Sequence, residues 1–187
     1  NEKLFNTFEL SLIDSLVSLL VNARQDIPLA SVMLSVFAPE PFSEDELLRI
    51  RNETDRELMF HDAVPAYRQA GTALAAKVGR FLDRIAGWRR QSHRFSVSEL
   101  ISSILTETGF ADYAASLPQA SARLSFLTRF LKWLQAADPG DLRTLLAVIA
   151  EMRSRGSALK DFQSDNAAGQ IRVMTMHAAK GLEFKVV

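Results

Sequence analysis

Apolar residues recur with a helical period over most of the chain. Near the N-terminus, Ile13, Leu16, Val17 and Leu20 stand at positions i, i+3, i+4 and i+7, which predicts a helix with one apolar face from about residue 9 to 22. The same period predicts further helices after Asp26, Ser43, Pro65, Ser96, Pro118 and Asp138, the last one ending near residue 156. The pattern therefore indicates a mainly α protein.

Polar residues mark the N-termini of several of these helices. Residues 43–46 and 96–99 both read Ser-x-x-Glu, a capping box in which each side chain accepts a hydrogen bond from the backbone N–H of the other residue. Asp26 is predicted to cap its own helix, and Asp138, which precedes a proline, is predicted to cap the last one. Gly109 is predicted to end the helix that begins after residue 96.

The C-terminal stretch has a different period. Residues 156–169 are rich in Ser, Asp, Ala and Gly and are predicted to be a connector. In residues 171–176 the side chains alternate with the period of a β-strand. Residues 177–181 then form a polar turn, and residues 182–187 look like the start of a further strand. The predicted fold is a multi-helix domain followed by a short β-segment.

Composition excludes several classes of protein. The 187-residue chain is 48% hydrophobic and 24% charged, as in ordinary globular domains, and it has no cysteine for disulfides, thiolate metal sites or nucleophiles. No apolar run approaches the ~20 residues that cross a bilayer and no signal peptide is visible, so a cytoplasmic location without membrane contact is expected. His61 and His93 have no partners at metal-ligand spacing, so no metal site is expected. Because the chain starts without methionine and stops within an apolar run, we expect a fragment of a larger protein.

The zero net charge hides an asymmetry between two parts of the chain. Residues 1–62 hold 12 acids and 5 bases, whereas residues 63–187 hold 10 acids and 17 bases. A basic region attracts phosphate backbones. The alternative is that these charges are the solvated faces of amphipathic helices.

The densest basic cluster lies at the end of the long helix predicted after Pro65. Residues 88–95 contain Arg89, Arg90 and Arg94, together with a histidine and two aromatic residues. Cations beside aromatic rings can hold a nucleic-acid backbone, which makes the three arginines candidate DNA-binding residues. Alternatively, the cations only stabilise the negative C-terminal end of the helix dipole.

The loop that follows the predicted strand offers the most varied chemistry in the chain. Thr175 supplies a hydroxyl, His177 an imidazole and Lys180 a cation. Gly181 permits a tight turn, and the Glu183 carboxylate can accept hydrogen bonds from ribose hydroxyls. The C-terminal end of a strand is where α/β folds bind ligands, although the same groups can also merely satisfy a polar turn.

The strand and loop described above resemble a motif of a known protein family. Residues 171–184, Ile-Arg-Val-Met-Thr-Met-His-Ala-Ala-Lys-Gly-Leu-Glu-Phe, resemble motif V of superfamily 1 DNA helicases of the UvrD/Rep/RecB type, without a gap. Residues 22–30, 42–47 and 123–130 more loosely resemble one branch, the AddA subunit of bacterial helicase–nucleases that process double-strand breaks during repair and recombination.

The resemblance implies a domain arrangement. Residues 1–8 are expected to lead in from the RecA-like subdomain 2A, and residues 9–156 to form the helical accessory subdomain 2B. Residues 157–169 are the expected connector. Residues 170–187 are expected to begin the return into subdomain 2A and to carry motif V.

The resemblance also implies roles for individual residues. Thr175 and His177 match positions that contact single-stranded DNA, and Glu183 matches the position that contacts the nucleotide sugar. Lys180 and Gly181 match the loop between them, so this corner is expected to couple nucleotide state to the grip on DNA. In the relatives, the 2B subdomain contacts duplex DNA, which is the role implied for the arginine cluster.

The chain lacks the parts that would make it an enzyme by itself. It contains no Gly-x-x-x-x-Gly-Lys-Ser/Thr phosphate loop and no Asp-Glu pair after an apolar strand. ATP and Mg²⁺ are therefore expected in the full-length parent and not in this stretch. The implied partners are DNA, the rest of the polypeptide and a second, AddB-like nuclease subunit. Two alternatives are a helical module that docks this second protein, and a UvrD-like helicase without a nuclease.

Overall fold

The computed structural model describes residues 7–155, apart from the side chains of Met152, Ser154 and Arg155. Within this range the protein is helical and has no strand, which confirms the mainly α prediction. The predicted connector and β-segment lie outside the described residues. The helices are α1 (Phe8–Val21), α2 (Asp26–Met33), α3 (Glu44–Glu53), α4 (Phe60–Tyr67), α5 (Ala73–Gln91), α6 (Val97–Glu107), α7 (Phe110–Ser116), α8 (Ala120–Ala137) and α9 (Leu142–Arg155).

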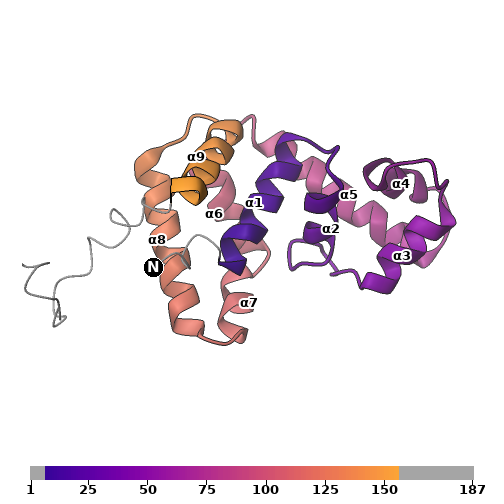
Figure 1. Ribbon diagram of the computed structural model, residues 1–187, viewed down its shortest axis with the longest axis horizontal. Coiled ribbons are helices and arrows are strands. Elements are labelled where there is room, and N and C mark those ends of the chain that lie inside the picture. The colour runs from indigo at the N-terminus through magenta and orange to yellow at the C-terminus, as the bar shows by residue number, and fades with distance from the viewer. Residues whose placement is uncertain (1–6, 156–187) are drawn as a thin grey trace, which may run out of the picture.

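The helices form an elongated bundle with α1 near its middle (Figure 1). Helices α6 to α9 pack at one end, beside α1, and helices α2, α3 and α4 pack at the other. Helix α5 joins the two ends, because it contacts α4 on one side and α6 and α1 on the other. One continuous hydrophobic core runs through both ends.

Helix α1 has the predicted apolar face and a further buried edge. Ile13, Leu16 and Val17 are fully buried, as the helical period predicts. Leu12 and Leu19, one heptad apart and outside the predicted stripe, are also buried. The face is wider than the sequence indicates because α1 lies between α2 and α9 and contacts both.

Arginines from three other helices bond to polar groups of α1. Near its start, the Glu9 side chain is only 2% exposed and pairs with Arg123 of α8. One turn later, Asp14 Oδ2 lies 2.5 Å from Arg153 Nη1 of α9. Arg89 of α5 donates to a carbonyl in the last turn of α1. A buried charge without a partner is costly, so these contacts constrain how α5, α8 and α9 seat on α1.

Both predicted capping boxes are present, but the predicted cap of the last helix is wrong. Ser43 and Ser96 accept hydrogen bonds from the third helical residue, whose glutamate accepts one in return. Asp138 instead ends α8 with φ of 38°, in the left-handed region. The cap of α9 is Asp141, whose Oδ1 accepts a hydrogen bond from Thr144 N at 2.7 Å. The chain needs residues 138–141 to turn between the two helices, which moves the cap past the proline.

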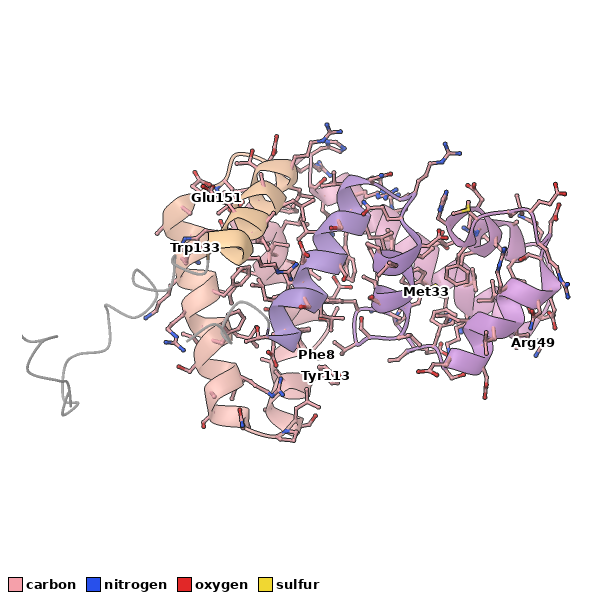
Figure 2. The ribbon with its side chains drawn as sticks, in the orientation of Figure 1. Phe8, Met33, Arg49, Tyr113, Trp133 and Glu151 are labelled. Carbon is pink, nitrogen blue, oxygen red and sulfur yellow. The ribbon has the colours of Figure 1, made fainter. Side chains whose placement is uncertain are left out.

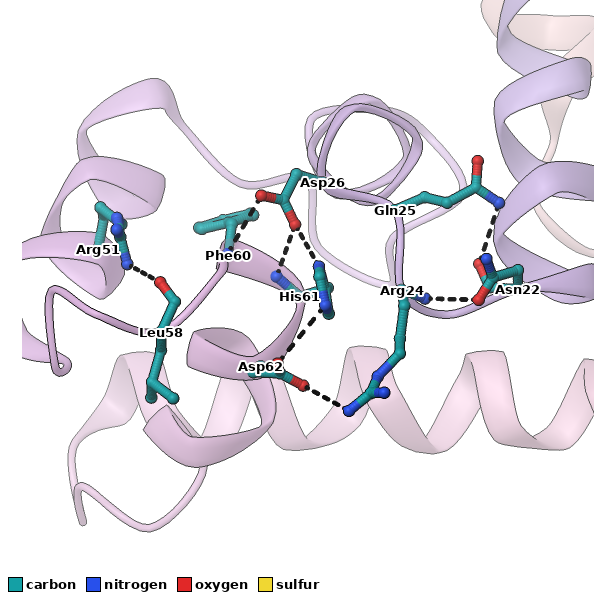
Figure 3. A network of polar contacts seen from close by, with 9 residues as sticks. All are labelled: Asn22, Arg24, Gln25, Asp26, Arg51, Leu58, Phe60, His61 and Asp62. Atoms are coloured by element: carbon teal, nitrogen blue, oxygen red, sulfur yellow. Dashed lines mark hydrogen bonds and ion pairs between the residues drawn. The ribbon is translucent and has the colours of Figure 1, made fainter.

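Asp26 caps a different helix from the one predicted. It is the first residue of α2, and its carboxylate accepts hydrogen bonds from the backbone N–H groups of Phe60 (3.3 Å) and His61 (3.0 Å) at the start of α4. Asp26 Oδ1 also lies 2.5 Å from the His61 ring Nδ1 (Figure 3). The residue at the N-cap position of α4, Met59, has no capping side chain. The loop before α4 is therefore held by a residue that is distant in sequence.

Two short helices were not predicted. The long helix expected after Pro65 begins only at Ala73, because Pro65 lies inside the separate helix α4. Gly71, with φ of +68°, makes the turn between α4 and α5. Gly109, with φ of +63°, ends α6 as predicted, but helix α7 then follows it directly.

The connection between α2 and α3 is a loop that is partly buried. Phe37 is stacked on Phe110 of α7, with ring centroids 5.1 Å apart. Phe42 N donates to the backbone oxygen of Met33, which lies in the interior (Figure 2), at 2.9 Å. Because the loop supplies core side chains, it links the two ends of the bundle.

The contacts of Asp26 predict an acid-sensitive contribution to stability. Burial raises the pKa of Asp26, but the hydrogen bonds from the His61 side chain and from the backbone N–H groups of His61 and Phe60 together hold the pKa below its ordinary value of 3.8. The folded chain therefore binds this proton less tightly than the unfolded chain does. The resulting stabilisation is complete above about pH 4 and is lost as the pH falls below that value.

Replacement of Asp26 by asparagine keeps an oxygen acceptor but removes the negative charge, and should lower the free energy of unfolding by about 1 kcal/mol at pH 7, the difference between hydrogen bonds to charged and to neutral acceptors. It should also flatten the decline in stability below pH 4, as measured by urea unfolding between pH 3 and 7. Asp62→Asn is the matched control, because that carboxylate meets only side chains, at 3.5 Å and 3.8 Å. An Asp26→Asn variant with unchanged acid sensitivity would contradict the assignment.

Candidate nucleic-acid interface

The predicted site residues fall into two groups. Thr175, His177, Lys180, Gly181 and Glu183 lie outside the described residues, so their roles stay predictions. The arginine cluster of residues 89–94 is described, and it lies at the C-terminal end of α5.

Local sequence explains how α5 carries this cluster. Thr72 caps the helix by accepting a hydrogen bond from Ala75 N at 3.0 Å. Val78, Phe81 and Trp88 bury one face against the core. The helix then ends at Gln91, within the basic segment.

The two aromatic residues of the cluster differ in their surroundings. Trp88 is buried, and its indole Nε1 donates to Glu107 Oε2 at 3.1 Å. This tryptophan therefore belongs to the core and cannot stack on a nucleic-acid base. Phe95 is 52% exposed and is the aromatic side chain that remains accessible.

Arg89 is partly buried and stabilises the fold. Its guanidinium donates to the backbone oxygen of Leu19, one of the last carbonyls of α1, which lack partners within their own helix. Arg89 Nε is buried and has no hydrogen-bond partner within the described residues. Burial lowers the pKa of Arg89 below its ordinary value. Of the three predicted arginines, Arg89 is the one whose guanidinium donates a hydrogen bond to another part of the described chain.

Arg90 and Arg94 are exposed and make no ion pair with any residue between positions 7 and 155. Earlier cations of the same helix do have acidic partners. Lys77 Nζ lies 2.7 Å from Glu46, Arg80 lies 2.7 Å from Glu40, and Arg84 lies 3.7 Å from Glu107. The positive charge that α5 leaves uncompensated is therefore concentrated at its C-terminal end.

A pocket of about 430 Å³ opens beside this end of α5. Its walls come from the end of α1, the end of α5, residues 95–100 and the start of α9. Arg89 and His93 line it on one side and Arg143 on another. Arg143 was not predicted as a site residue, because no local pattern links the start of α9 to the end of α5. Only the packing of both helices against α1 brings them together.

The charges around the pocket are mixed. Asp141 also lines it, and its pKa is lowered by hydrogen bonds from the backbone and side chain of Thr144, so its carboxylate is ionised at neutral pH. Asp141 stands two residues before Arg143 at the start of α9, so its negative charge offsets the charge of Arg143. The arrangement can hold a phosphate group best on its α5 side. Within residues 7–155, no group of His, Cys, Asp or Glu side chains could hold a metal ion.

Comparison with known proteins defines the class. A family model described as the UvrD-like helicase C-terminal domain matches residues 1–187. The chain therefore belongs to the UvrD-like helicase C-terminal domain family, as the motif V resemblance predicted.

Individual relatives define the branch. The chain is 34% identical over 190 residues to the AddA subunit of the ATP-dependent helicase/nuclease from Bacillus licheniformis, and 33% identical over 196 residues to that from Geobacillus kaustophilus. It is 34% identical over 202 residues to the protein of the same name from Heliobacterium modesticaldum. Each match covers 98% of the chain, which confirms the predicted similarity to AddA.

The chain spans about 15% of the length of the relatives it matches. None of the helices between residues 7 and 155 combines the length and the apolar character needed to cross a membrane.

Substitution of Arg89 and substitution of Arg90 should have different effects on stability. Arg89→Met removes the hydrogen bond to Leu19 and should lower the free energy of unfolding by about 1.5–3 kcal/mol, as for other bonds to charged groups. Arg90→Met should leave the thermal midpoint unchanged, because the side chain is exposed. Thermal unfolding followed by circular dichroism measures both. Equal midpoints for the two variants would show that Arg89 does not support the end of α1.

Proposed function

We propose that this chain is the DNA-orienting accessory region, with motif V, of an AddA-type ATP-dependent DNA helicase–nuclease that acts in double-strand-break repair and recombination in the bacterial cytoplasm. The proposed DNA binding rests on the positive charge of Arg90 and Arg94 at the end of α5, which no acidic residue of the described chain compensates. The family match supports the parent activity.

The chemistry of this surface fits a duplex backbone. Exposed guanidinium groups donate two parallel hydrogen bonds to phosphate oxygens and displace condensed counterions, without reading the base sequence. His93 and Arg143 add donors on either side of the adjoining pocket. Phe95 offers an accessible ring at the same end of α5. The proposed contact is therefore with the sugar–phosphate backbone, and it positions the DNA without specifying sequence.

The proposed boundaries are those expected from the sequence. Residues 1–8 lead in from subdomain 2A, residues 9–156 form subdomain 2B, residues 157–169 connect, and residues 170–187 return to subdomain 2A. The continuous helical core between α1 and α9 supports the second of these ranges as one unit.

Motif V is proposed to couple nucleotide state to DNA contact. Thr175 and His177 are assigned to the single strand, and Glu183 to the nucleotide sugar. Lys180 and Gly181 form the loop that joins them. ATP and Mg²⁺ are bound by other parts of the full-length enzyme, which also works with a second nuclease protein. Because the relatives are named as parts of a helicase/nuclease, a parent with a nuclease is favoured over a UvrD-like helicase without one.

A salt-dependent binding measurement tests the α5 surface. Fluorescence anisotropy with a labelled DNA duplex should show that Arg90→Ala/Arg94→Ala weakens binding about tenfold at low salt. The slope of the logarithm of the association constant against that of salt concentration should fall by about 0.9 for each phosphate contact removed. Both effects follow from the loss of two exposed cations.

The matched control is Arg49→Ala/Arg56→Ala, which removes the same charge from the α3 end of the bundle, where Arg49 is labelled in Figure 2. This double variant should bind the duplex nearly as well as the unmodified chain. Equal losses from the two double variants would mean that only net charge matters, and would remove the α5 surface from the proposal.

The motif V proposal is tested in a full-length helicase–nuclease that contains this chain. His177→Ala and Glu183→Gln should each reduce DNA-stimulated ATP hydrolysis about tenfold, the effect of losing roughly 1.4 kcal/mol of interaction. Lys160→Ala, in the predicted connector, is the control and should retain the activity. Full DNA stimulation and unwinding in both motif variants would exclude these residues from the coupling.

A further inference from the structure

An apolar groove shares no lining residue with the pocket beside the arginine surface. It runs between α2 and α3 and has a volume of about 480 Å³. Ile27 and Ala30 of α2 form one wall, and Leu47 and Leu48 of α3 form the other. Phe60 lies between the two helices, next to Asp26 and opposite Arg51 (Figure 3).

The groove exposes large apolar side chains that the fold itself does not bury. Ile27 is 80% exposed and Leu48 is 59% exposed. Met59 does not line the groove, but it precedes Phe60, which does, and is 58% exposed. Removing such side chains from water is favourable, so a partner that covers two or three of them gains binding energy. Contiguous exposed apolar surface of this kind marks an interaction site.

The rim of the groove is negatively charged. Asp26 and Glu44 border it, and Asp45 follows on α3. Glu44 and Asp45 are exposed and form no ion pair within the described part of the chain. Arg51 also lines the groove and keeps its positive charge, although its guanidinium donates to the backbone oxygen of Leu58 at 2.5 Å and to two neighbouring carbonyls. The carboxylates of Asp26 and Glu44 in the lining, with Asp45 beside them, outnumber this single cation, so the opening is net negative.

The negative charge of the rim favours some ligands of the groove over others. A DNA duplex or an anionic membrane surface is repelled by the rim. A second copy of the chain would place one acidic rim against another. A protein segment with apolar side chains and flanking lysines or arginines is complementary in both respects. The shape favours a helix, because apolar side chains at i, i+3 and i+4 fit between two neighbouring helices.

We propose that the α2–α3 groove docks an apolar helix with flanking basic residues, supplied by a second polypeptide. The described chain supports a separate partner, because Phe8 packs near Tyr113 of α7 and Arg153 near Asp14 of α1. Both ends of the described chain thus lie at the end of the bundle remote from the groove (Figure 1). This inference goes beyond the proposed DNA contact and does not depend on it.

The experiment uses a labelled synthetic peptide of 18 residues with leucines at i, i+3, i+4 and i+7 and lysines beside them. Two peptides serve as comparisons: one with glutamates in place of the lysines, and one with the same composition in an order that has no apolar face. Binding to the 187-residue chain is followed by fluorescence anisotropy. The basic amphipathic peptide should bind at least tenfold more tightly than either comparison peptide.

Groove variants then locate the binding site. Ile27→Asn and Leu48→Asn should each weaken binding at least fivefold, and Glu44→Gln/Asp45→Asn about threefold with a reduced salt dependence. Leu124→Asn, which changes an exposed leucine of α8, and Arg90→Ala/Arg94→Ala should have no effect on peptide binding. Because Ile27 and Leu48 are exposed, circular dichroism should show both variants folded, and two independent positions guard against misfolding of one.

Three outcomes would overturn the proposal. The first is equal binding of all three peptides, and the second is tight binding that the groove variants leave unchanged. The third is a different occupant, seen as concentration-dependent dimerisation or duplex binding that Leu48→Asn abolishes. Loss of duplex binding in Arg90→Ala/Arg94→Ala, with peptide binding intact, keeps the two surfaces distinct.

Discussion

The structure depends on satisfying the polar groups of a buried central helix. Helix α1 carries a carboxylate, Glu9, inside its apolar face, and its last carbonyls point into the bundle. Arg123 of α8 forms an ion pair with Glu9, and Arg89 of α5 donates a hydrogen bond to the backbone oxygen of Leu19. A buried carboxylate without its cation costs about 3–5 kcal/mol, and a buried carbonyl without a donor about 1–3 kcal/mol. The surrounding helices are therefore restricted to positions from which the arginines reach. Burial of the apolar side chains of α1 and the bonds to its polar groups therefore favour the same arrangement of the helices around it.

This constraint distinguishes cations that bond to groups of the protein itself from exposed cations that can bind a ligand. A sequence shows many arginines and lysines in the basic part of the chain, but most of those on α5 are engaged with acids or carbonyls. The exposed charge at the end of the helix is what remains. At the α2–α3 groove the acidic side chains are in excess, and Glu44 forms no ion pair within the described residues. The C-terminal end of α5 and the α2–α3 groove thus carry opposite charge.

This difference in charge suits the two proposed contacts. The basic end of α5 can hold a phosphate backbone, and the acidic, apolar groove can hold a basic protein segment without attracting nucleic acid. The exposed side chains of both surfaces can be changed with little effect on the core that connects them, because that core consists of other residues. The two surfaces can therefore be tested independently.

The sequence by itself determined the features that depend on neighbours a few residues apart. The helical class, the buried face of α1 and both capping boxes could be predicted, because their contacts join residues i and i+3 or i+4. Motif V was recognisable because its residues are contiguous. Tertiary structure alone decided which helix Asp26 caps, where the α9 cap lies, and that Arg143 shares a pocket with Arg89. Those contacts join residues that are far apart in sequence or depend on how the connecting turn is shaped by packing, so no local pattern encodes them.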